Sequence, residues 1–248
     1  MTKRPARLQY PADSWSEYFP GAISPSMSLG MYLSDLRQLL LARSSADGER
    51  SNTGEMRTLA ELALIGLVAW LESFFRDQWA SVINICPRFL NVLAERKRPT
   101  LIDAIALLDL DAHPFRQIGL ILAERLDFGT PRQVNSLYRD LLGITPIGSR
   151  EARRLESIIH DRNLLVHYGG IVRFQHREPG FFPAQPLRRR FLDSVVLDCT
   201  GVNSVCDLVE RLAKKTAAAS ARAVRSFART EVISFSKEAN KAVRFLDC

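Results

Sequence analysis

The sequence predicts an all-α protein: a helical bundle with a short β-hairpin or a long loop excursion before its last long helix. Apolar residues recur every three or four positions over most of the 248 residues. Proline and glycine mark the ends of these stretches. Only residues 171–200 contain short β-like runs. Six to eight helices and two short strands follow, as expected for the α class.

The first part of the chain, residues 1–55, is expected to hold an arm, a first helix and a mobile loop. Residues 1–23 are Pro-rich and aperiodic, which predicts an arm without regular structure. A helix follows from Pro25 to about Arg43, because proline suits a first helical turn. The polar residues 44–54 predict a mobile loop. The apolar positions of the helix are Met27, Met31, Leu36, Leu39 and Leu40.

The second part, residues 56–170, is expected to form the helical core. The segment from Met56 to Ile85 is apolar nearly all round, which is typical of a buried central helix, and Pro87 ends it. The remaining helices each begin at an N-cap or a proline, and the last ends at Gly169-Gly170. We expect them at residues 101–108, 114–126, 131–142 and 149 to 167 or 168, the last with Ser149 as its N-cap.

The third part, residues 171–248, is expected to hold a basic loop or hairpin excursion followed by C-terminal helices. The excursion contains β-like runs near residues 171–174 and 191–197, separated by prolines. A long helix then begins at Asn203 or Ser204 and reaches about residue 229. The final segment, Val232 to Phe245, is weakly helical.

The charge of the chain points to a polyanion. The net charge is +7, and 28 of its 34 basic residues are arginines, which bind phosphate in bidentate fashion. Residues 150–190 carry a net charge of +5 and residues 211–248 carry +6. A polyanion would therefore meet the last hundred residues, unless these charges form a solvated face that binds nothing.

Composition argues against several other classes of protein. The longest apolar run, residues 62–71, is about half the length that a bilayer requires, and no secretory signal is visible, so we expect a cytoplasmic protein without a membrane span. The four cysteines lack Cys-x-x-Cys spacing and are expected to be reduced and buried. Neither a metal site nor a cofactor site is expected. The cysteines are Cys86, Cys199, Cys206 and Cys248.

The segment from Leu155 to His167 contains the most informative residues. On a helix, its aliphatic residues form one stripe and Arg162 falls in the middle of it. A buried guanidinium is costly without a carboxylate partner or a wet cleft. Glu72, an acid in an otherwise apolar helix, is the candidate partner. The stripe consists of Leu155, Ile158, Ile159, Leu165 and Val166.

A second stripe on the same helix holds His160, Asn163 and His167. Asn163 and His167 are four residues apart and so lie on one face, whereas Arg162 and His167 are about 140° apart. Arg162 could still reach the same cleft through its long side chain.

Arg162-Asn163-Leu-Leu-Val-His167 resembles the motif of HEPN domains, in which four residues separate Arg and His on a late helix of an all-α bundle. The segment 71–77, with its inward acid Glu72, is similar to the second helix of that family. The segment 131–143 is similar to the element before the motif helix in the bacterial RiboL-PSP-HEPN branch. The resemblance covers about residues 56–170.

This resemblance implies a metal-independent endoribonuclease that acts as a homodimer. His167 would serve as general acid or base, and Arg162 would stabilise the charged phosphate. Asn163 would orient either the phosphate or His167. Glu72, His160 and Asp161 would support the site, and His160 is an alternative second histidine. The product would be a 2′,3′-cyclic phosphate, so DNA would be inert. The resemblance does not reach the basic excursion, but its charge leads us to expect that RNA is held there by Arg173, Arg188, Arg189 and Arg190.

The resemblance also bears on partners and alternatives. In HEPN toxins that pair with nucleotidyltransferases, a tyrosine two residues after the His is modified by the antitoxin. Here Gly169 holds that position and Tyr168 follows His167 directly. A cognate antitoxin or another regulator remains a possible partner. The glycine in place of the tyrosine favours a stand-alone defence or stress nuclease. The alternatives are a HEPN-like module that binds RNA or protein without cutting, and an unrelated helical nucleic-acid binder.

Overall fold

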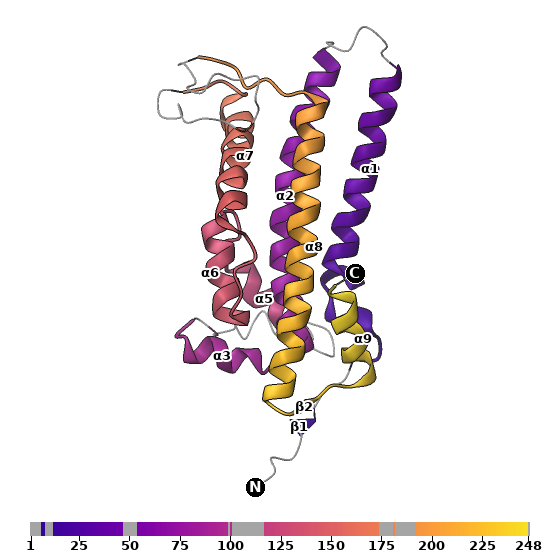
Figure 1. The fold of residues 1–248 in the computed structure, drawn as a ribbon, viewed down its shortest axis with the longest axis vertical. Coiled ribbons are helices and arrows are strands. Elements are labelled where there is room, and N and C mark those ends of the chain that lie inside the picture. The colour runs from indigo at the N-terminus through magenta and orange to yellow at the C-terminus, as the bar shows by residue number, and fades with distance from the viewer. Residues whose placement is uncertain are drawn as a thin grey trace. The chain divides into compact units, whose positions relative to one another are not determined.

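In a computed structural model, the chain is mostly helical, which confirms the all-α prediction (Figure 1). The described residues are 6–7, 12–46, 54–98, 100, 117–173, 181 and 192–247. The helices are α1 (Pro25–Ala46), α2 (Gly54–Ile85), α3 (Phe89–Glu95), α5 (Ile118–Glu124), α6 (Pro131–Leu142), α7 (Ser149–Tyr168), α8 (Cys199–Thr230) and α9 (Lys237–Phe245). Most of the predicted mobile loop, the helix at 101–108 and most of the excursion lie outside the described residues.

The N-terminal arm is more regular than predicted. It contains the 3-10 turns η1 (Trp15–Tyr18) and η2 (Pro20–Ala22), and β1 (Ala6–Arg7) pairs in parallel with β2 (Ile233–Ser234). Trp15 stacks on Phe245 of α9, with ring centroids 4.0 Å apart. This long-range contact fixes the arm, and no periodic pattern in the arm itself could reveal it.

The chain divides into two compact units that are each assembled from separate stretches. The first unit comprises residues 1–29, 73–147 and 212–248, and the second comprises residues 30–72 and 148–211. Helices α2 and α8 contribute residues to both units. This division by packing does not test the division into arm, core and basic segment that the sequence suggests.

The first unit has an aromatic core that polar contacts hold together. Tyr138 of α6 is fully buried and donates a hydrogen bond of 2.8 Å to the carbonyl oxygen of Phe75 in α2. The Trp79 indole N–H donates to the carbonyl oxygen of Leu137 at 3.3 Å. These bonds satisfy polar groups that would otherwise be buried without partners. They fix α6, which precedes the motif helix, against the second half of α2.

In the second unit, helix α1 buries a different set of residues from the one predicted. The buried residues of α1 are Leu29, Leu33, Leu36 and Leu40, of which Leu29 belongs to the first unit. Met27, Met31 and Leu39, which were predicted to lie on the apolar face, are exposed. The spacing of four, three and four residues is the ideal helical repeat. Charged contacts add to the packing, because the Arg37 guanidinium lies 2.8 Å from both Asp207 and Glu210 of α8.

Helix α2 was predicted to be buried all round, but part of its surface is exposed. Leu62 is 62% exposed and Trp70 is 37% exposed, with the Trp70 ring stacked on Tyr32 of α1. By length and composition, Gly54–Ile85 could cross a membrane, and 44% of its most apolar window is buried. Core helices of soluble proteins meet the same criterion, so this property carries little weight.

Helix boundaries follow their sequence signals with small shifts. Thr130 caps α6 and Gly143 ends it, as predicted. Helix α8 begins at Cys199, earlier than predicted, because Asp198 accepts the backbone N–H of Gly201 at 2.6 Å and so replaces a later cap. The excursion begins and ends in an antiparallel bridge between Ile171 and Ser194, which agrees with a hairpin-like base. Helix α3 was not predicted.

Candidate active site on helix α7

Helix α7 ends immediately after the candidate histidine. At its start, the Glu151 carboxylate accepts the backbone N–H of Gly148 at 2.9 Å, so Gly148 is the N-cap and Ser149, the predicted cap, is the first helical residue. At its end, Gly169 and Gly170 have φ angles of 59° and 76°, a conformation that favours glycine. The Gly170 N–H donates to the carbonyl oxygen of Leu164 at 2.9 Å. His167 is thereby held in the last turn of the helix.

The buried line of α7 differs from the predicted stripe. Its buried residues are Leu155, Ile158, Asp161 and Leu164, whereas Val166 is 47% exposed. These positions are three residues apart, so the inward face turns away from Arg162 and places Asp161 in the core. Arg162 is half-buried at the edge of this face. The ionisable side chain that this helix buries fully is therefore that of Asp161.

The predicted pair between Glu72 and Arg162 does not form. Both side chains are half-buried, and within the described part of the chain no hydrogen bond or ion pair joins them. The Arg162 Nε is buried and has no hydrogen-bond partner among the described residues. Because Arg162 lies beside the core rather than within it, a compensating carboxylate is not required. A buried donor without a partner costs about 1–3 kcal/mol, which an anion bound at Arg162 could relieve.

Asn163 and His167 lie on one face of α7, as the spacing predicts. Asn163 is half-buried and His167 is exposed, so a ligand can reach the imidazole. The His167 and Tyr168 ring centroids are 6.3 Å apart in an edge-to-face arrangement. The Arg173 guanidinium lies over the Tyr168 ring at 5.9 Å. The end of α7 thus brings His167 and Arg173 close to one exposed aromatic ring, that of Tyr168.

Asp161 and Arg154 together hold one residue of the excursion against α7. The Phe181 backbone N–H donates to Asp161 Oδ2 at 2.9 Å, and the Arg154 guanidinium lies over the Phe181 ring at 4.7 Å. Arg154 Nη2 also donates to Ser204 Oγ of α8 at 2.6 Å. Asp161 and Arg154 are seven residues apart, which places both on one face of the helix. Asp161 therefore has a positioning role.

The remaining candidate residues lie in different settings. His160 is half-buried, with its Nε2 shielded from solvent, so it is less accessible than His167. Arg188, Arg189 and Arg190 lie outside the described residues. Within the described ranges, no group of three or more His, Cys, Asp or Glu side chains could hold a metal ion.

Two cavities lie in the first unit, and none of the predicted site residues lines either of them. One, of about 830 Å³, lies between the end of α8, β2 and α9. The other, of about 610 Å³, lies between α3, α6 and α8 and is lined mainly by apolar side chains. The charge of residues 211–248 pointed to this region, but the aromatic residue that lines the first cavity, Phe235, gave no separate signal.

Comparisons with protein-family models, with curated proteins and with solved structures find no match to this chain.

Proposed function

We propose that this protein is a metal-independent endoribonuclease whose site is built on the last turns of α7. The observation that carries the proposal is the arrangement of the motif: Asn163 and the exposed His167 share a face, and Arg162, next to Asn163 in the chain, has a buried donor without a partner among the described residues. The likeness of this motif to HEPN domains and the all-α fold add support.

In the proposed reaction, a neutral His167 removes the proton of the ribose 2′-hydroxyl, and the 2′-oxygen attacks the adjacent phosphorus. The bond from phosphorus to the 5′-oxygen breaks, and a protonated imidazole returns a proton to that oxygen. Arg162 stabilises the negative charge that grows on the phosphoryl oxygens, and Asn163 orients the phosphate or the imidazole. The products are a 2′,3′-cyclic phosphate and a 5′-hydroxyl.

This reaction uses one imidazole as base and one as acid, so we propose that two copies of the chain form the working site. RNA is the substrate, and a cytoplasmic location and a role in defence or stress response fit this activity. A cognate antitoxin or regulator belongs to the same proposal. In a mixture of wild-type and His167→Ala chains, activity should fall with the square of the wild-type fraction, to about a quarter at equal amounts. A linear fall would contradict a two-histidine site.

The reaction class is tested by incubating the protein with a structured RNA in EDTA and identifying the fragment ends by mass spectrometry. We expect fragments that end in cyclic phosphate, and no cleavage of the same sequence made as DNA. Activity that disappears with EDTA would contradict the metal-free reaction. His160→Ala tests the alternative second histidine: we expect cleavage to persist in this variant.

A module that binds RNA or protein without cutting is the second candidate function. It is favoured by one observation, because Arg162 and His167 stand about 140° apart on α7 and do not share a face within one chain. A protein that binds RNA but yields no cyclic phosphate at any protein concentration would support this candidate.

A further inference from the structure

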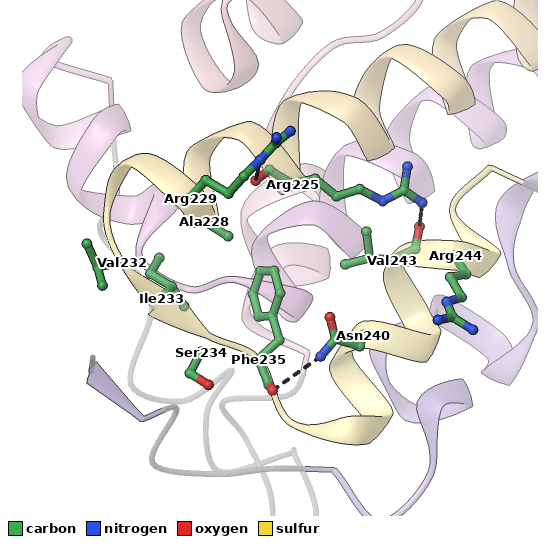
Figure 2. A pocket seen from close by; sticks show the side chains of 10 residues that line it. All are labelled: Arg225, Ala228, Arg229, Val232, Ile233, Ser234, Phe235, Asn240, Val243 and Arg244. Carbon is green, nitrogen blue, oxygen red and sulfur yellow. Dashed lines mark hydrogen bonds between the residues drawn. The ribbon is translucent and has the colours of Figure 1, made fainter. Parts of the chain in front are cut away.

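The cavity at the end of α8 is lined by both basic and apolar side chains. Its lining includes Phe235, whose ring rises from the link between β2 and α9 toward α8 (Figure 2). Arg225 and Arg229 come from the last turns of α8, and no carboxylate is among the described residues that line the cavity. A volume of about 830 Å³ falls within the range of ligand sites.

Among the described residues, no acid forms an ion pair with Arg225 or Arg229 of α8. Arg225 Nη2 donates to the carbonyl oxygen of Val243 at 3.4 Å, and Arg229 Nε donates to the carbonyl oxygen of Arg225 at 3.3 Å (Figure 2). Each guanidinium has five N–H donors, so most of them stay available to an anion.

These arginines continue a basic stripe along α8. No acidic residue occurs between positions 211 and 230, and the basic side chains from 214 to 229 fall within about 100° of the helix circumference. The stripe is about 22 Å long at the usual helical rise. It consists of Lys214, Lys215, Arg222, Arg225 and Arg229, which are exposed or half-buried.

We infer that this cavity binds a segment of single-stranded RNA, with one unstacked base against Phe235 and its flanking phosphates on Arg225 and Arg229. A charge stripe that extends beyond the cavity suits a polymer with repeating phosphates better than a small anion. An aromatic ring among apolar lining side chains suits a base that has left its stack. The choice of RNA over another polyanion rests on the proposed function.

The test uses the full chain with His167→Ala and a labelled RNA of about 12 nucleotides, a length typical of one single-strand site. The RNA carries 2′-O-methyl groups, so it cannot be cleaved. The dissociation constant is measured by fluorescence anisotropy at several salt concentrations. The test variants are Arg225→Gln with Arg229→Gln, and Phe235→Leu. The control is Arg43→Gln with Arg132→Gln, which removes the same charge from two exposed arginines outside the cavity. Circular dichroism checks that each variant is folded.

We expect the paired cavity variant to bind at least tenfold more weakly. Its salt slope, the slope of the logarithm of the binding constant against the logarithm of the salt concentration, should fall in magnitude by about 1.4, because two phosphate contacts are lost. Phe235→Leu should weaken binding about tenfold without changing the salt slope. The control should change binding less than about threefold, because it removes no contact. Cavity variants that bind like the control would overturn the inference.

A duplex of the same length tests the single-strand preference. We expect it to bind more weakly than the single strand and to be insensitive to Phe235→Leu; a duplex with the same Phe235 dependence would overturn the single-strand assignment. The proposed nuclease fails separately: its failure would leave this binding in place. Failure of the cavity would leave His167-dependent cleavage in place.

Discussion

The buried carboxylate of Asp161 makes the sharpest prediction about stability. Its side chain is fully buried, and its Oδ2 accepts the Phe181 backbone N–H at 2.9 Å. Asp161→Ala removes the acceptor of the Phe181 backbone N–H. Hydrogen bonds to charged groups are worth about 1.5–3 kcal/mol. We therefore expect Asp161→Ala to lower the free energy of unfolding by about 2 kcal/mol, and Asp161→Asn, which keeps an acceptor oxygen, to lower it by about 1 kcal/mol.

Two measurements test this prediction. Urea unfolding gives the global free energy of unfolding, and hydrogen exchange of the Phe181 amide reports the specific bond. A loss of 2 kcal/mol corresponds to exchange about 30-fold faster. Ser157→Ala is the control on the same helix, because the Ser157 hydroxyl donates only to the Arg153 carbonyl oxygen within α7, at 3.1 Å.

The opposite outcome also has a physical meaning. If Asp161→Ala were as stable as the wild type, the desolvation of the carboxylate would cost as much as its hydrogen bonds return. Unchanged exchange at Phe181 would show that Asp161 does not hold this residue of the excursion. Only the unchanged exchange would refute the positioning role, whereas unchanged stability would refute the expected loss of 2 kcal/mol.

Three further predictions concern the core. Tyr138→Phe removes the hydrogen bond to Phe75 and should cost about 1–1.5 kcal/mol in urea unfolding, and a variant as stable as the wild type would contradict that bond. Gly119→Ala places a methyl group against the α2 backbone and should lower the free energy of unfolding by about 3 kcal/mol, whereas a neutral result would mean that α5 can shift. Burial raises the pKa of both Cys86 and Cys206 to about 11, so both stay protonated thiols at pH 8. Iodoacetamide should therefore label them only in urea, which peptide mass spectrometry measures. Native labelling at the unfolded rate would contradict this burial.

Local signals made several parts of the fold predictable. Thr130 and Gly143 bound α6 because a hydroxyl cap and a left-handed glycine satisfy the end groups of a helix without distant contacts. Gly169 and Gly170 end α7 for the same reason, which placed His167 in the last turn from sequence alone.

Long-range contacts were not predictable. The pattern placed Arg162 in the core, but the residue in the core is Asp161, which is bonded to Phe181 twenty positions away. Likewise, the apolar pattern from Met56 to Ile85 predicted a helix buried all round, although the Trp70 ring in it lies against Tyr32 and is partly exposed. Such choices depend on which surfaces meet, and a single helical pattern does not contain that information.

The most direct test of the proposed site compares the rates at which wild-type protein and His167→Ala cleave RNA in EDTA, under single-turnover conditions. General acid–base catalysis contributes about 10²–10⁴-fold, so the variant should be at least 100-fold slower. Val166→Ala, on the same exposed turn, is the control and should cleave at the wild-type rate. A His167→Ala rate within about threefold of wild type would remove His167 from the chemistry and contradict the proposed site.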